Sequence, residues 1–251
     1  MKMASTCRIV FVAMFLVMAY LSAGEASAGP IGPSPYLSFA DSPFNGGSFS
    51  YFHLETFEDH LLNTPGVTAN AGGVASVVFG PSIHDSVDAD DGVIDGSGLA
   101  GDSYFTSSGS AGVRFTFSAA ILGSLPTHAG IVWTDGSGTT SFEAFDALNN
   151  SLGIIGPVAI ANASFNGETA EDRFFGWTNA GGISSIFISN QFGGMEVDHL
   201  QYGLAASVGP TVPEPASLLL LATGLIAVMA WRLTRNPVTA FNRSVPKERD
   251  L

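Results

Sequence analysis

The densest set of side chains that could bind a metal ion is an acidic cluster near the middle of the chain. Its carboxylates are Asp88, Asp90, Asp91 and Asp95. Closely spaced oxygen ligands suit calcium, but the helix–loop–helix calcium motif would need glycine in place of Val93 and glutamate in place of Leu99. The spacing therefore excludes that motif. Two interpretations remain: an irregular calcium loop, or an aspartate-glycine turn with solvated charges.

The sequence gives little support for a zinc site or for catalysis by a nucleophilic side chain. The histidines are His53, His60, His84, His128 and His199. None of them pairs at the spacing of a helical metal site, and a single cysteine in the chain makes a structural zinc site unfavourable. There is no Gly-x-Ser-x-Gly segment of the kind that presents a catalytic serine. These observations predict no catalytic residue.

Two kinds of residue in the sequence could hydrolyse or bind a sugar. Paired carboxylates would support a polysaccharide hydrolase, and the candidates are Glu55, Glu143, Glu168 and Glu171. No spacing pairs any two of them. Trp177, which follows Arg-Phe-Phe-Gly, is the candidate for stacking on a sugar ring. The alternative for this tryptophan is a place in the core.

The region between residues 29 and 211 is strongly acidic. Of the 22 Asp and Glu residues in the chain, 18 lie in this region, and the four outside it are Glu25, Glu214, Glu248 and Asp250. Of the nine Lys and Arg residues only Arg114 and Arg173 lie inside, which gives the region a net charge of −16. Such a surface repels nucleic acid and attracts divalent cations. We therefore predict no nucleic-acid partner.

Alternation of apolar and polar residues predicts short β-strands in this region. Val113, Phe115 and Phe117 share one face of the clearest example. Further candidates are 49–57, 74–79, 131–133, 139–145, 183–189 and 195–202. Glycine-rich and Asp-Gly segments separate them. The pattern predicts an all-β domain over residues 29–206, as an antiparallel β-sandwich or jelly roll.

The C-terminal segment has three parts. It begins with Val212, Pro213, Glu214 and Pro215, whose prolines remove backbone donors and hold the chain extended. Residues 216–231 follow without a charge, and at about 1.5 Å per residue they span roughly 24 Å of a roughly 30 Å hydrocarbon core. Arg232 and Arg235 come next, which suits a cytoplasmic end. The segment predicts one transmembrane helix; the alternatives are a buried core helix and a permanent anchor.

The N-terminal segment has the pattern of a secretory signal peptide. A basic start is followed by an apolar run over 9–21 and by the small residues Ala26 and Ala28. This order predicts a signal peptide over 1–28 that signal peptidase removes, leaving Gly29 as the first mature residue. An uncleaved anchor is the alternative.

The C-terminal pattern resembles the PEP-CTERM sorting signal of Gram-negative, exopolysaccharide-producing bacteria. The matching positions are Pro213, Glu214 and Pro215, with the apolar run as the helix. The resemblance implies a sorting signal at 212–235 between a linker at 207–211 and a polar basic tail at 236–251. It also implies processing by exosortase, a membrane protease-transpeptidase. The chain would be anchored transiently in the inner membrane and would then reach the cell surface or extracellular matrix.

Two segments of the acidic region resemble the first and last strands of galactose-binding-like and MAM-like jelly rolls. These segments are Phe57-Glu58-Asp59 and the range 195–203. In such folds the two strands come together, sometimes around calcium. The resemblance implies a structural calcium site whose ligands are Glu58, Asp59, Glu196 and Asp198. The alternative is that these carboxylates are solvated or cap backbone amides.

Two functions are compatible with these features. The favoured one is a non-enzymatic, exported β-sandwich protein of the cell envelope or exopolysaccharide matrix, with adhesion or carbohydrate binding as its role. The alternative is a secreted hydrolase that acts on polysaccharide. A sandwich fold hosts unrelated activities, so the fold alone does not separate the two.

Overall fold

The computed structural model describes residues 29–79, 85–162, 164–206, 223–228 and 231. The chain divides into two compact units, residues 1–206 and 207–251. In the second unit, residues 223–228 are helical. Among the described residues, no helix is long and apolar enough to span a bilayer. The signal peptide, the linker, the basic tail and most of the helix expected over 216–231 lie outside the described residues, so these assignments stay predictions.

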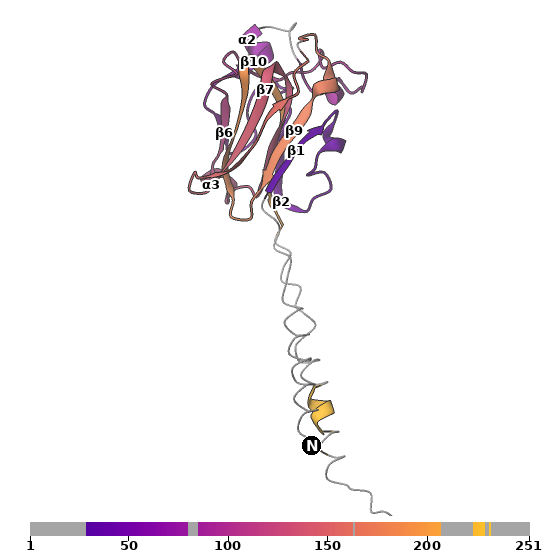
Figure 1. Cartoon of the computed structure of the whole chain (residues 1–251), viewed down its shortest axis with the longest axis vertical. Coiled ribbons are helices and arrows are strands. Elements are labelled where there is room, and N and C mark those ends of the chain that lie inside the picture. Colours follow the sequence, from indigo (N-terminus) through magenta and orange to yellow (C-terminus); the bar gives the residue numbers. More distant parts are fainter. Residues whose placement is uncertain (1–28, 80–84, 163, 207–222, 229–230, 232–251) are drawn as a thin grey trace, which may run out of the picture. The chain divides into compact units, whose positions relative to one another are not determined.

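The regular structure of the first unit is mostly antiparallel β-sheet with a few short helices, which confirms the predicted all-β class (Figure 1). The strands are β1 (Gly29–Pro35), β2 (Phe49–Glu55), β3 (Val67–Ala69), β4 (Gly73–Val74), β5 (Tyr104–Thr106), β6 (Val113–Phe117), β7 (His128–Asp146), β8 (Ser151–Ala159), β9 (Arg173–Thr178) and β10 (Ile183–Ala205). The short helices are η1 (Phe39–Asp41), α2 (Ala75–Phe79), η2 (Asp88–Asp91), α3 (Ala119–Leu122) and η3 (Thr169–Glu171).

Strands β7 and β10 form the spine of the domain. They pair along most of their length, from His128 opposite Gly203 to Asp146 opposite Ile183. The first half of β7 also pairs with β9 and the second half with β8. Similarly, the first half of β10 pairs with β6 and its last part with β2. Each long strand therefore pairs along both of its edges, with different neighbours in its two halves, within one continuous hydrogen-bonded sheet.

The two long strands bend where glycines interrupt them. Gly138 has a φ of 77° and Gly193 a φ of 75°, values that glycine adopts far more readily than other residues. The β7–β10 register also shifts between Asn190 and Met195. The sheet folds over at this bend, and rings from its two halves meet: Phe117 and Tyr202 have centroids 4.8 Å apart.

A single main core fills the space between the two halves. Along β6 the apolar side chains alternate inward as predicted, and Val113, Phe115 and Phe117 are all buried. Trp133 of β7 is fully buried, and its Nε1–H donates to Oδ1 of Asn190 at 2.9 Å. Burial of aromatic rings on this scale is the main stabilising contribution of a β domain of this kind.

The strand predicted over 74–79 is wrong. Strand β4 ends at Val74, and helix α2 begins at Ala75. The cause is a cap that lies far away in the sequence: the carboxylate of Asp102 accepts the backbone N–H of Ser76 at 3.0 Å. A carboxylate at a helix N-terminus satisfies amides that a strand would direct to a neighbour.

Candidate ligand-binding pocket

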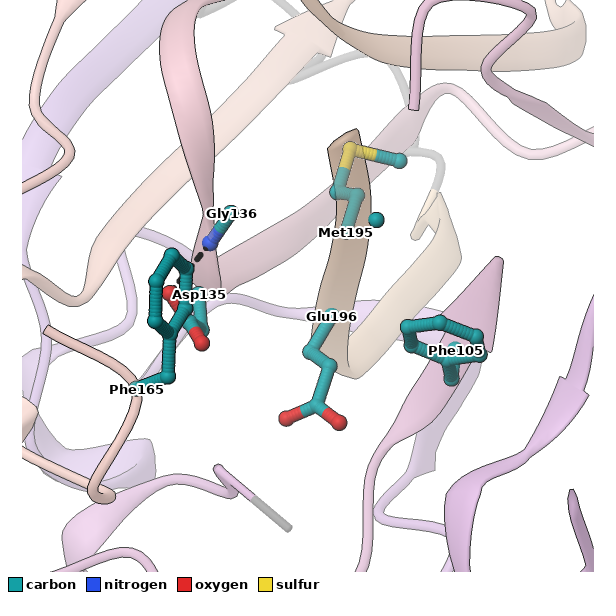
Figure 2. A pocket seen from close by; sticks show the side chains of 7 residues that line it. Phe105, Asp135, Gly136, Phe165, Met195 and Glu196 are labelled. Carbon is teal, nitrogen blue, oxygen red and sulfur yellow. Dashed lines mark hydrogen bonds between the residues drawn. The ribbon is translucent and has the colours of Figure 1, made fainter. Parts of the chain in front are cut away.

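A pocket lies on the sheet at the point where β10 runs between its neighbours β7 and β5. Glu196 on β10 is directly opposite Asp135 on β7 and opposite Phe105 on β5. Side chains directly opposite each other across antiparallel strands point to the same face, so the register brings these three together. The pocket encloses about 260 Å³ and is lined by Phe105, Asp135, Gly136, Phe165, Gly194, Met195 and Glu196 (Figure 2).

Burial perturbs the two carboxylates of the pocket. It raises the pKa of Glu196 to about 8, although the backbone N–H of Asp85 donates to Glu196 Oε2 at 2.7 Å and opposes the shift. Burial likewise raises the pKa of Asp135 to about 7, against the hydrogen bond from the N–H of Gly136. Carboxyl groups with raised pKa values in a pocket are typical of functional sites.

Aromatic rings flank these acids. Figure 2 shows Phe165 and Phe105 on either side of the Glu196 carboxylate. Phe165 is 57% exposed although it is large and apolar. Apolar walls with a few directed hydrogen-bond acceptors suit a ligand that has both a hydrophobic face and hydroxyl groups.

Two loops that close this end of the domain are tied together. The N–H of Gly98 donates to the carbonyl of Gly167 at 2.9 Å, and Ser97 bridges to Glu168. In addition, the hydroxyl of Thr169 donates to Asp88 Oδ2 at 2.9 Å. These contacts hold the 85–102 segment against the 164–172 segment, from which Phe165 projects.

The acidic cluster Asp88, Asp90, Asp91 and Asp95 does not form one ion-binding group in the described structure. Asp88 accepts the backbone N–H groups of Asp95 and Gly96. Asp91 accepts the N–H of Val93 at 2.8 Å at the surface. These two carboxylates therefore accept backbone amides of the 88–96 loop.

The four carboxylates implied as calcium ligands also separate. Glu58 Oε1 accepts the N–H of Asp102 at 2.6 Å, and Asp59 accepts from Leu61 and Asn63 within its own turn. Glu196 and Asp198 instead bind the backbone of the 85–87 segment. The chain turns sharply after β2, with positive φ at Phe57 and His60, and this turn gives Asp59 its local partners.

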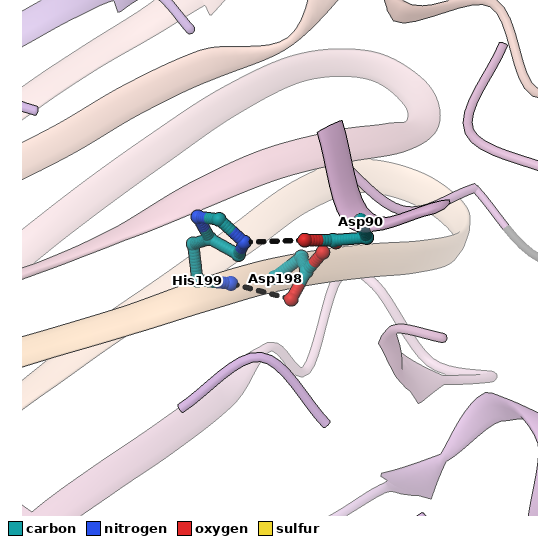
Figure 3. Close-up of side chains that lie close together, drawn as sticks. All are labelled: Asp90, Asp198 and His199. Atoms are coloured by element: carbon teal, nitrogen blue, oxygen red, sulfur yellow. Dashed lines mark hydrogen bonds and ion pairs between the residues drawn. The ribbon is translucent and has the colours of Figure 1, made fainter. Parts of the chain in front are cut away.

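Asp198 belongs to a different, buried polar network (Figure 3). His199 Nε2 lies 2.8 Å from Asp90 Oδ1, and its backbone N–H donates to Asp198. The other ring nitrogen lies 2.8 Å from the hydroxyl of Tyr36. Burial, followed by the charge of Asp90, raises the pKa of Asp198 well above its ordinary value. The network links β10 to η2.

Ser76, His60 and Asp102 also meet, but not as a catalytic triad. Asp102 Oδ2 lies 2.8 Å from Nδ1 of His60, and Ser76 Oγ lies 3.0 Å from the same nitrogen. A triad needs the serine and the acid on opposite ring nitrogens, so that the imidazole can take the serine proton while the acid orients it. The arrangement supports capping of α2 and not nucleophilic catalysis.

Asp102→Asn is expected to lower the free energy of unfolding by about 1–2 kcal/mol at pH 7. Burial raises the pKa of Asp102, but hydrogen bonds from Ser76 and His60 outweigh burial and hold this pKa below its usual value. A carboxylate whose folded pKa is lowered stabilises the fold above its unfolded pKa and loses this contribution as pH falls through the folded value. Urea unfolding should therefore separate wild type from variant at pH 7 and much less at pH 3. Equal destabilisation at both pH values would contradict this role.

Trp177, the sequence candidate for sugar stacking, is only 6% exposed. Its indole packs directly over Gly153 of β8, where an added Cβ would lie 2.6 Å from the ring. No ring face is left for a sugar. Phe165, unlike Trp177, has an exposed ring. Its only signal in the sequence is that it is an aromatic residue inside a polar loop.

The sorting signal is found independently of the structure. A family model described as the PEP-CTERM protein-sorting motif matches residues 211–236. The matched range contains every residue that the sequence assigned to the signal: Val212, Pro213, Glu214, Pro215, Arg232 and Arg235. Searches of curated proteins and of solved structures gave no match to the chain. The chain is therefore an exported, exosortase-targeted protein whose PEP-CTERM sorting motif follows an antiparallel β domain.

Proposed function

We propose that this protein is a non-enzymatic component of the cell envelope or exopolysaccharide matrix, and that its β domain binds polysaccharide. The observation that carries the proposal is the pocket, whose lining combines the carboxyl groups of Asp135 and Glu196 with the rings of Phe105 and Phe165. The sorting motif supports delivery to the surface of a Gram-negative cell, where polysaccharide is the abundant ligand. In the pocket, the rings contact the C–H face of a sugar and the carboxyl groups bind its hydroxyls.

Hydrolysis of polysaccharide is the second candidate, and one observation favours it. Asp135 and Glu196 have pKa values raised to about 7 and about 8, as a general acid requires near neutral pH. Binding is preferred because one oxygen of Glu196 is already occupied by the N–H of Asp85. This hydrogen bond gives Glu196 a structural role that restricts its use as an acid or nucleophile.

Phe165→Ala is expected to weaken polysaccharide binding about tenfold, which corresponds to roughly 1.4 kcal/mol of lost ring contact. Phe192→Ala is the matched control, since Phe192 is 56% exposed but lies outside the pocket lining. Titration calorimetry of the purified exported chain with exopolysaccharide fragments measures both variants. Equal affinities for the two variants would contradict the proposed site.

The same samples separate binding from hydrolysis. Binding alone predicts no increase in reducing ends during prolonged incubation with the polysaccharide. Turnover that Glu196→Gln abolishes would support the hydrolase instead. The reducing-sugar assay reads the polymer directly and does not depend on the binding constant.

A further inference from the structure

A second group of acids lies beside the pocket and shares Asp135 with it. It consists of Asp85, which precedes η2, Asp135 on β7 and Glu171 in η3. One oxygen from each residue lies within 4.8 Å of the other two. Three segments that are far apart in the sequence therefore direct carboxylates to one point.

Two of these carboxylates are buried without hydrogen-bond partners. Asp85 is 3% exposed and Glu171 is 5% exposed. Within the described part of the chain, both carboxylate oxygens of each residue lack a hydrogen-bond partner. The same holds for the fully buried neighbour Asp172. Buried polar atoms in native proteins are nearly always paired, so such a group indicates that a partner belongs there.

The nearest cationic side chain does not supply that partner. Arg173 uses its Nη1 to donate to the backbone carbonyls of Ala170 and Asp172. Its charge opposes the rise in the pKa values of Glu171 and Asp172, but burial outweighs it and both values are raised. Burial also raises the pKa of Asp85 to about 9, with the charge of Asp135 next in size. Burial therefore disfavours the charged form of these carboxyl groups unless a cation is bound.

We propose that Asp85, Asp135 and Glu171 bind a calcium ion. An all-oxygen ligand set favours a hard cation over zinc or copper. Ligands at about 2.3–2.6 Å from calcium lie up to roughly 5 Å from one another, which accommodates the observed spacing. One proton neutralises one carboxylate and still leaves most oxygens of the cluster without a donor, whereas a cation satisfies charge and coordination together. The site stands whether or not the pocket binds a saccharide.

The other acidic group of the described structure shows the contrast. Asp90, Asp198 and His199 are as close together, but they bind one another and the N–H of Val87. Most carboxylate oxygens of this network have hydrogen-bond partners. Both ring nitrogens of His199 also lie within hydrogen-bond distance of a partner. It therefore has less need of an ion, and Asp198 provides a buried control carboxylate.

The test is calcium titration of the chelator-treated, purified exported chain in detergent. Wild type is expected to bind calcium, and its melting temperature should rise by about 5–10 °C at roughly 100 times the dissociation constant. Glu171→Gln and Asp135→Asn should each weaken calcium binding at least about 100-fold, because each removes one of few charged ligands. Magnesium, which prefers shorter bonds and retains its water, should give a smaller shift.

Two controls make the result specific. Asp198→Asn removes a buried carboxylate outside the cluster, and Asp91→Asn removes an exposed charge from the neighbouring loop; both should keep affinity within about threefold of wild type. Equilibrium dialysis of the wild type is independent of how any variant folds. A wild-type dissociation constant above about 10 mM would overturn the proposal, since extracellular calcium modules bind at about 0.1–1 mM or tighter. Unchanged affinity in both Glu171→Gln and Asp135→Asn would also overturn it.

Discussion

Replacement of Pro213, Glu214 and Pro215 together by alanine is expected to abolish exosortase processing while leaving export intact. The three residues lie in the matched sorting motif. The two prolines remove backbone donors and disfavour helix, so their loss changes the conformation that the enzyme meets as well as the side chains that it reads. An epitope placed after Leu251 should then stay on the whole exported population. Immunoblotting and intact mass of the exported chain measure the retained segment.

The matched control is Pro237→Ala, one residue beyond the end of the match at 236. It removes a proline from the same segment and should leave processing at the wild-type rate. Cells without exosortase provide the second control and should accumulate the wild-type chain in unprocessed form. If the alanine variant matured as fast as wild type, the motif would not be the signal that directs processing.

The second large effect is expected in the core. Trp133→Ala should lower the free energy of unfolding by about 3–5 kcal/mol, because it leaves a cavity the size of an indole. The residue is fully buried on the central strand β7, and its ring N–H donates to Asn190 where β7 and β10 begin to bend. The loss is a large fraction of the roughly 5–15 kcal/mol that stabilises a typical domain. Urea unfolding followed by circular dichroism measures it.

Leu148→Ala is the matched control for this prediction. Leu148 is 82% exposed in the turn that follows β7, so its truncation should change the unfolding free energy by at most about 0.5 kcal/mol. Trp133→Phe keeps an aromatic ring and should fall between the two. A loss below about 1 kcal/mol for Trp133→Ala would mean that this indole is not part of the main core.

The strands themselves were largely predictable because local alternation survives in them. The prediction for 113–117 coincides with β6, and the prediction for 49–57 overlaps β2. From the sequence, glycine-rich segments predict strand ends, whereas in β7 and β10 they mark bends within one continuous strand. The sequence predicts no strand at β1 because its residues are rich in glycine and proline. Its place is set by pairing with β9 and not by local propensity.

The site was harder to predict because its parts come from distant segments. Asp135 and Glu196 meet through the β7–β10 register, which depends on bulges that sequence spacing does not reveal. Glu171 is one of the candidate hydrolase carboxylates in the sequence, but no sequence pattern links it to Asp85. The resemblance to jelly-roll calcium sites implies Glu196 as a calcium ligand. It missed the neighbouring group whose oxygens lack partners, because burial and hydrogen-bond satisfaction are properties of the folded chain.

Binding of polysaccharide by the exported β domain is expected to take place in the pocket lined by Phe105 and Phe165. It is tested most directly by titration calorimetry of the purified wild-type chain with fragments of the exopolysaccharide made by the producing cells. We expect saturable binding in the micromolar to millimolar range, roughly −4 to −8 kcal/mol, with no release of reducing ends. Absence of saturable binding to these fragments at millimolar concentration would contradict it.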